Sequence, residues 1–221
     1  MKAVKLTFQW LVVLFMVIIF IRGMMLLFSP PEATRPAGDL VAVIDFTGVI
    51  LEADTLTETF RTLEKDSQVK GYVMRVNSGG GLVSPSQEIY EYLLTLKKPL
   101  YVAMGASAAS GGYMISLPAN KIYAMPSTVT GSIGVIMQIP NYEGLYQKIG
   151  LDQNVIKSGK FKDSGNPARP MTDEERAVLS AVVMDMYEQF AQAVSVRRNL
   201  DIDETKKLAD GRIYTGKMAK E

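Results

Sequence analysis

Residues 71–112 read GYVMRVNSGGGLVSPSQEIYEYLLTLKKPLYVAMGASAASGG. An apolar strand over residues 71–76 leads through a glycine-rich loop to a helix over residues 84–96, and a second apolar strand over residues 100–104 leads into another loop of small residues. Short buried strands that alternate with helices are typical of a parallel sheet. The stretch therefore predicts an α/β fold with both loops at the carboxyl ends of strands, where such sheets bind ligands.

The chain continues this alternation on both sides of the stretch. Further strands are predicted at residues 40–45, 121–124, 131–137 and 154–157, and further helices at residues 55–65, 142–149 and 172–199. Thr172 and Glu175 have the spacing of a capping box, which marks the start of the last helix. No internal repeat is visible, so we expect residues 40–221 to form one domain.

The amino-terminal residues have a different composition. Residues 6–28 carry a single charge, Arg22, and follow Lys2 and Lys5. A helix of this length reaches about 35 Å, enough to cross the ~30 Å hydrocarbon core of a bilayer. A cleaved signal peptide is the alternative, although no small-residue cleavage motif follows the apolar run. We expect a transmembrane anchor at residues 6–28 and a proline-rich linker at residues 29–39. Residues 1–5 would then lie in the cytoplasm, and residues 40–221 on the extracytoplasmic side of the inner or plasma membrane.

The composition excludes several kinds of function. Lys and Arg number 24 and Asp and Glu number 23, so the net charge of +1 gives no support for nucleic-acid binding, which needs a clustered basic surface. The absence of Cys removes disulfides and thiolate metal sites, and the absence of His removes the Ser-His-Asp triad and His-ligated metals. We therefore expect no metal and no cofactor, and any hydrolase must take its base from Lys, Asp, Glu or Tyr.

The two loops of small residues could support acyl-transfer chemistry. In residues 77–81 (NSGGG), the lack of side chains would let a substrate approach backbone N–H groups, as in an oxyanion hole, and a flexible turn is the alternative. Ser110 lies where the second loop meets a helix and is followed by two glycines, which exposes its hydroxyl as in a nucleophile elbow. A tightly packed helix face is the alternative there, and Ser107 is a second candidate nucleophile.

A serine nucleophile needs a base, and without histidine a lysine is the strongest option. Free lysine has a pKa of about 10.4, so burial must bring it to roughly 7–8 before it can act near neutral pH. Lys157, Lys160 and Lys162 all lie in the segment IKSGKFKD, residues 156–163. Asp163 would favour the charged form of Lys162 if it faced that side chain, and we expect its carboxylate to point away.

Several motifs, taken in order, carry a resemblance to a known family. They are RVNSGGG at residues 75–81, MGASAASGGYMIS at 104–116, PSTVTGSIGV at 126–135, SGKFKD at 158–163 followed by MTDEE, and ADGRIYTG at 209–216. Behind a membrane segment, these motifs make the sequence resemble the signal peptide peptidase A family of membrane-anchored serine proteases, whose fold is similar to those of the Clp protease and crotonase. The resemblance covers residues 40–221.

The resemblance implies a Ser-Lys dyad. Ser110 would be the nucleophile, and Lys162, the lysine that precedes aspartate in the SG-x-x-KD motif, would be the general base. Ser132 would hold this lysine through a hydrogen bond, and the amides of Gly80 and Gly111 would form the oxyanion hole. The resemblance also implies cleaved signal peptides or other apolar peptides at a lipid membrane as substrates, no cofactor, and a homo-oligomeric ring in which neighbouring subunits can complete the dyad.

The sequence departs from the family pattern at three points. Gly79 stands where relatives usually have proline, which should loosen the loop but spare its amides. Relatives continue beyond residue 216 with a further apolar segment, so we expect this chain to be a piece truncated at its carboxyl end. It also holds one protease unit where some relatives hold two. The alternative functions are a catalytically silent, membrane-bound peptide-binding scaffold, a protease that cleaves membrane-protein partners, and an acyl-CoA enzyme of crotonase type.

Overall fold

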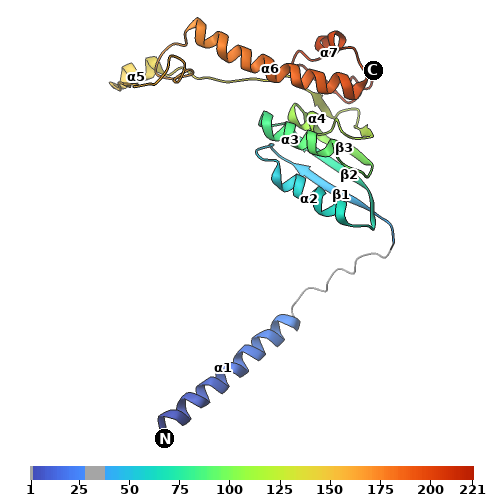
Figure 1. Cartoon of the computed structure of the whole chain (residues 1–221), viewed down its shortest axis with the longest axis vertical. Coiled ribbons are helices and arrows are strands. Elements are labelled where there is room, and N and C mark those ends of the chain that lie inside the picture. Colours follow the sequence, from blue (N-terminus) through green and yellow to red (C-terminus); the bar gives the residue numbers. More distant parts are fainter. Residues whose placement is uncertain (1, 28–37) are drawn as a thin grey trace. The chain divides into compact units, whose positions relative to one another are not determined.

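The computed structural model describes residues 2–27 and 38–221, which divide into two units, Met1–Gly38 and Asp39–Glu221 (Figure 1). The second unit is built on a mostly parallel sheet, as the alternation of strands and helices predicts. The spatial order is β1-β2-β3-β5-β6, and β4 pairs with β3 beside this path. The strands are β1 (Leu40–Thr47), β2 (Val69–Ser78), β3 (Leu100–Ala109), β4 (Lys121–Tyr123), β5 (Val129–Gly131) and β6 (Ile213–Thr215). Within the described residues all pairings are parallel except that of β5 with β6.

Helices α2 (Asp54–Lys65) and α3 (Val83–Leu94) pack on one face of this sheet (Figure 1). Met74 of β2 and Val102 of β3 join Phe60 of α2 and Ile89 of α3 in a core from which water is excluded. The rings of Phe60 and Tyr72 meet edge to face, with centroids 5.1 Å apart. This core holds β2 and β3 side by side, and so it fixes the two loops at their carboxyl ends relative to each other.

A second, smaller core attaches the long carboxyl-terminal helix to the end of β3. It joins Met114 to Phe190, Val194 and Ile133. The capping box predicted at Thr172 is present, because Thr172 and Glu175 each accept a hydrogen bond from the backbone N–H of the other. The other described helices of this unit are α4 (Gly111–Met114), α5 (Glu143–Ile149), α6 (Asp173–Arg198) and α7 (Ile202–Leu208).

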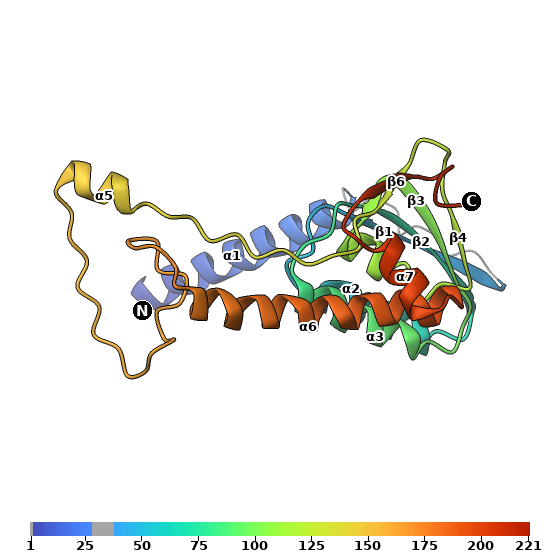
Figure 2. The ribbon, with the colours of Figure 1, turned by 90° about the horizontal axis from the view of Figure 1, so that it is seen from above.

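Between β5 and α6 the chain forms an extended segment, residues 132–172, which we call the arm. It leaves the sheet, carries α5 beyond the amino-terminal end of α6, and returns to that end (Figure 2). The strands predicted at residues 131–137 and 154–157 are wrong, because only Gly131 of these residues belongs to a strand. Ser132 has a φ of 51°, which turns the chain out of the sheet, and Ile136 is 82% exposed with no neighbouring strand in the described residues.

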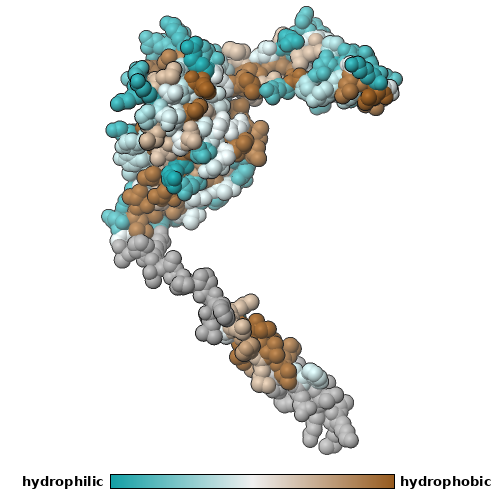
Figure 3. Space-filling view, turned by 180° about the vertical axis from the view of Figure 1, so that it is seen from behind, coloured by the Kyte–Doolittle hydropathy of each residue, from teal (hydrophilic) through white to brown (hydrophobic). Residues whose placement is uncertain are grey.

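In the first unit, the described residues other than Gly38 form helix α1 (Lys2–Leu27). The described large apolar side chains of α1, among them Trp10 and Phe20, are exposed (Figure 3). Within residues 2–27 and 38–221, no helix is both long enough and apolar enough to cross a membrane, so the transmembrane anchor predicted for residues 6–28 is not confirmed. The linker predicted for residues 29–39 falls outside the described residues, apart from Gly38 and Asp39.

Candidate active site

Ser110 lies in a strained backbone turn between β3 and α4. Its φ of 53° and ψ of −125° lie outside the regions that residues with a side chain normally adopt. The N–H of Ser110 donates to the carbonyl of Gly131 at 2.8 Å, and its carbonyl accepts from the N–H groups of Tyr113 and Met114 at 2.9 Å. These bonds hold the strained turn in place at the start of α4, in the strand–turn–helix arrangement of a nucleophile elbow.

The glycine-rich loop after β2 packs directly on this turn. A Cβ on Gly80, whose φ is 101°, would lie 2.7 Å from the nitrogen of Gly111 and 2.8 Å from the Cβ of Ser110. Ile50 holds the loop from the other side, since its N–H donates to the carbonyl of Gly80 at 3.0 Å. Gly80 therefore has to be glycine both for its backbone angle and for its close approach to Ser110. A Cβ on Gly79, by contrast, would meet nothing within 4 Å.

The two amides predicted for an oxyanion hole differ in availability. The N–H of Gly111, at the first position of α4, makes no hydrogen bond with the described residues and is free to meet an oxyanion. The N–H of Gly80 donates to Ser78 Oγ at 3.1 Å. An oxyanion would have to replace Ser78 as the acceptor, so Gly111 is the stronger candidate.

Ser110 and Ser132 border the same cavity, which has a volume of about 710 Å³. The N–H of Ser132 donates to the carbonyl of Arg212 at 2.8 Å, so the residue that precedes β6 holds Ser132 at this cavity. The wall includes the apolar side chains of Ile133, Val135 and Met184. The cavity can therefore receive an apolar side chain next to the hydroxyl of Ser110.

The charged groups at this cavity are paired. Lys206 of α7 lines it, and its Nζ lies 2.6 Å from Glu188 of α6; this contact raises the pKa of Lys206. Asp210, also on the wall, is bound by the guanidinium of Arg212 at 2.5 Å. No sequence motif points to Lys206, because only the packing of α7 on α6 brings it to the cavity. Within the described residues, no three His, Cys, Asp or Glu side chains are grouped so as to hold a metal ion.

Lys162 lies on the arm, in turns that end before α6 begins. Its side chain is exposed and makes no hydrogen bond or ion pair with the described residues, while its N–H donates to the carbonyl of Gly159 at 3.1 Å. The two neighbouring lysines are engaged: Lys157 contacts Asp163 at 2.5 Å, and Lys160 pairs with Glu174. Of the three candidate bases, Lys162 is the one whose amine has no partner among the residues described.

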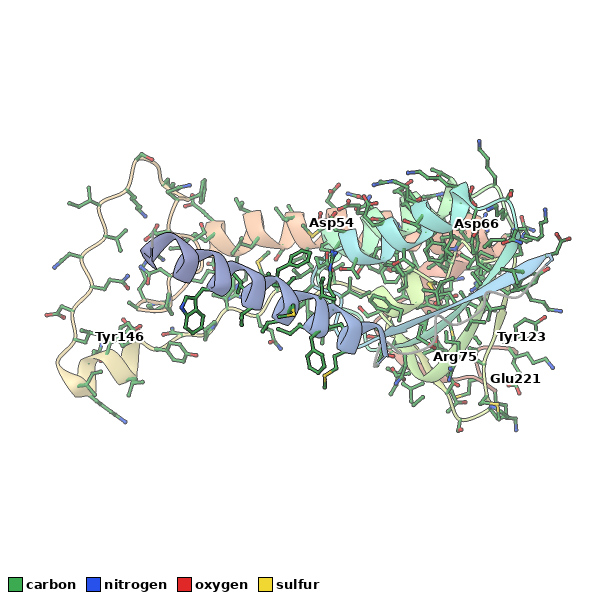
Figure 4. All side chains as sticks on the ribbon, turned by 90° about the horizontal axis from the view of Figure 1, so that it is seen from below. Asp54, Asp66, Arg75, Tyr123, Tyr146 and Glu221 are labelled. Atoms are coloured by element: carbon green, nitrogen blue, oxygen red, sulfur yellow. The ribbon has the colours of Figure 1, made fainter. Side chains whose placement is uncertain are left out.

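A single chain does not bring Lys162 and Ser110 together. Lys162 is not among the residues that line the cavity of Ser110, and no hydrogen bond joins the two side chains within the described residues. The arm leads away from the sheet, so that Tyr146 on α5 lies at the opposite end of this unit from Arg75 and Tyr123 of the sheet (Figure 4). The serines and glycines predicted for the site are assembled by the fold, and the predicted base is not.

Asp163, next to Lys162, belongs to a cluster of ion pairs. Its carboxylate contacts Lys157 at 2.5 Å and Arg169 at 3.0 Å, in agreement with the expectation that it points away from Lys162. The hydrogen bond from Lys157, followed by that from Arg169, lowers the pKa of Asp163 to about 2. Arg169, and after it the N–H of Thr172, lowers the pKa of Glu175 to about 2. Both carboxylates are therefore charged throughout the neutral range.

Comparison with known proteins identifies the family. Residues 93–221, more than half of the chain, match peptidase family S49. The chain belongs to peptidase family S49. Residues 50–132 also match the Clp protease family. ClpP1 of Listeria monocytogenes, solved as a point mutant, superposes with a TM-score of 0.54 over 80% of this chain and 85% of that one at 18% identity, which shows the fold. The predicted Clp protease-like α/β architecture with a parallel sheet is thus confirmed.

Curated relatives share the same part of the family. A protein of Methanocaldococcus jannaschii, provisionally named a protease, is 44% identical over 160 residues, which cover 72% of this chain and 51% of that protein. A protein of Enterococcus faecium, provisionally named signal peptide peptidase SppA, is 43% identical over 164 residues, which cover 73% of this chain and 48% of that protein. Protease 4 of Salmonella typhi is 34% identical over 195 residues, which cover 83% of this chain and 31% of that protein. The chain therefore spans about half or less of the length of these relatives.

The ion pairs around Asp163 and Glu175 predict how the start of α6 responds to acid. A carboxyl whose pKa is lowered by folding stabilises the fold above its ordinary pKa of roughly 4, and this contribution is lost as the pH falls from there toward about 2. A carboxyl ¹³C NMR titration should give midpoints near 2 for both groups. Arg169→Gln should raise both midpoints, whereas Arg176→Gln should leave them unchanged. Midpoints near 4 in the unaltered chain would contradict the assigned contacts.

Proposed function

We propose that this chain is the serine endopeptidase unit of a membrane-anchored protease, with Ser110 as nucleophile and Lys162 of a neighbouring copy as general base. The observation that carries the proposal is the strained turn at Ser110, which lies beside the free N–H of Gly111 and borders a cavity with apolar side chains on part of its wall. Strain at a serine that borders a cavity and adjoins a free backbone N–H is typical of a catalytic position.

The reaction follows from these groups. The neutral amine of Lys162 takes the proton of Ser110 Oγ as the oxygen attacks the peptide carbonyl, and the N–H of Gly111 stabilises the oxyanion that forms. The lysine then returns the proton to the leaving amine, which breaks the peptide bond and leaves an ester on Ser110. Water, deprotonated by the same lysine, then attacks this ester. The lysine passes that proton to Ser110 Oγ as the ester bond breaks, which releases the acid and restores both the serine hydroxyl and the neutral amine. Ser132, on the same cavity, holds the amine in place by a hydrogen bond.

A second copy is required because Lys162 is exposed in one chain. A lysine surrounded by water keeps its proton at neutral pH, whereas a lysine enclosed in an apolar site loses it more easily. The arm also exposes apolar side chains, among them Ile149 at 64% and Ile136 at 82%, which an assembled protein would cover. The assembly proposed here is a ring in which the arm of each copy delivers Lys162 to the Ser110 cavity of the next.

The proposed substrates are cleaved signal peptides and other apolar peptides. The support is the apolar wall of the cavity, which includes Ile133, Val135 and Met184, and the name of the Enterococcus faecium relative. No cofactor takes part in the proposed reaction. A peptide-binding scaffold without activity, a protease for membrane-protein partners and a CoA-dependent enzyme are outcomes that the experiments below would separate.

Mixing two inactive variants tests the dyad and its sharing between copies. Ser110→Ala and Lys162→Ala should each lower the hydrolysis of an apolar fluorogenic peptide by at least about 10³-fold. When the two variants are co-expressed with different tags and purified together, about a quarter of the interfaces in a ring should pair an intact Ser110 with an intact Lys162, so activity should return.

Lys148→Ala is the matched control, since Lys148 is exposed on the same arm but lies outside the group of ion pairs around Lys162, and it should keep full activity. Activity that remains in Ser110→Ala or in Lys162→Ala alone would reject the dyad. Two inactive variants that never complement each other, in rings shown to be mixed, would reject sharing between copies.

Gly80 and Gly79 form a second matched pair. Gly80→Ala would force a Cβ to within 2.7 Å of the Gly111 nitrogen, so it should displace the oxyanion donor and lower the rate by about 10²-fold or more. Gly79→Ala has open space and should leave the rate nearly unchanged. Equal rates for the two variants in the same peptidase assay, with both folded by circular dichroism, would contradict the assigned oxyanion site.

The membrane location belongs to the same proposal. The exposed apolar side chains of α1, such as Trp10, Phe15 and Phe20, favour burial in lipid over contact with water. The full chain should remain in the membrane pellet after alkaline carbonate extraction, whereas residues 38–221 expressed alone should be released. Protease added outside spheroplasts should digest the catalytic unit if that unit is extracytoplasmic. Release of the full chain into the carbonate supernatant would rule out the anchor.

A further inference from the structure

The ion-pair cluster at the start of α6 contains a buried bridge that the reaction above does not use. The guanidinium of Arg169 lies between two carboxylates, 3.0 Å from Asp163 and 2.5 Å from Glu175. The side chain of Asp163, on the arm, is only 13% exposed, and that of Glu175, in the first turn of α6, is only 4% exposed. Charged groups buried to this extent are found where they are paired and hydrogen-bonded.

The bridge fixes the turns that carry Lys162. Asp163 directly follows Lys162 in sequence, and its backbone carbonyl accepts from the N–H of Asn166 at 3.0 Å. At the other end, Glu175 accepts from the N–H of Thr172 at 2.9 Å and so belongs to the capping box of α6. Arg169 thus ties the residue beside the proposed base to the first turn of a helix of 26 residues.

The bridge also determines which charges Lys162 meets. Around it, three cations, Lys157, Lys160 and Arg169, are matched by three carboxylates, Asp163, Glu174 and Glu175. Lys162 is left without a partner in the described part of the arm. In the proposed ring it would also meet the pairs Lys206–Glu188 and Asp210–Arg212 at the cavity of the next copy. Those pairs lie on a different chain and do not depend on Arg169.

We propose that Arg169 is a positioning residue for Lys162: it binds Asp163 so that this carboxylate cannot pair with the base, and it holds the turn that carries the base. This inference rests on the proposed function. Without Arg169, the carboxylate of Asp163 has only Lys157 as a partner and can swing to the adjacent amine. An opposite charge at that distance favours the charged ammonium, which cannot accept a proton from Ser110.

The pH dependence of kcat/KM for an apolar fluorogenic peptide tests the inference. In Arg169→Gln, the acidic limb of the profile should move to higher pH by about one unit or more, so the rate at pH 7 should fall about tenfold and recover at alkaline pH. Adding Asp163→Asn should return the limb to its original position. Arg169→Lys, which can still hold Asp163, should give a smaller displacement, and Arg176→Gln should give none.

The outcomes separate this inference from the proposed function. A limb that does not move in Arg169→Gln, with the rate lowered equally at every pH, would show that Arg169 only supports the fold. A displacement that persists after Asp163→Asn is added would show that Asp163 is not its cause. Either result overturns the inference while Lys162→Ala stays inactive, whereas an active Lys162→Ala overturns the proposed function itself. If Arg169→Gln proves unfolded by circular dichroism, Arg169→Lys with and without Asp163→Asn gives the same comparison.

Discussion

The strained turn at Ser110 is the constraint on which the rest of the site depends. A residue with a side chain adopts a φ of 53° and a ψ of −125° only when its surroundings hold it there. The carbonyl of Gly131, the first turn of α4 and the close approach of Gly80 provide that hold. Each depends on the order β2-β3-β5 in the sheet, and the order depends on the core between the strands and helices α2 and α3.

The arm is held together by different interactions from those of the sheet. The sheet buries its apolar side chains and pairs its strands, whereas the arm extends from it with several large apolar side chains exposed. Its described internal order comes largely from ion pairs and backbone turns around residues 157–175. The nucleophile is held rigidly by the sheet, whereas the base lies on a projecting segment that ion pairs keep in order. This arrangement fits a catalytic site assembled between copies, because association would remove water from around the lysine, which a single chain does not do.

The glycine and serine positions of the candidate site could be predicted because short sequence patterns determine them. A loop of three glycines after a strand, and a serine followed by two glycines after another, each imply a close backbone approach that any parallel sheet would bring to the same edge. The strands predicted at residues 131–137 and 154–157 failed because apolar composition says nothing about whether a neighbouring strand is available. No sequence motif predicts that Lys206 lines the cavity, because this depends on the packing of α7 on α6. Nor does any motif predict the ion pairs of Arg169, because they depend on the fold of the arm.

By itself, the sequence determined the parallel α/β sheet, the placement of its two glycine-rich loops, the capping box of α6 and the family, because periodicity, glycine spacing and ordered motifs are local properties of the chain. Only the tertiary structure decided that Gly111 offers a free N–H while Gly80 does not, that Lys157 and Lys160 are paired while Lys162 is not, and that Lys162 lies away from the Ser110 cavity. Hydrogen-bond partners, charge pairing and burial are properties of what the folded chain brings together, and residue order alone does not specify them.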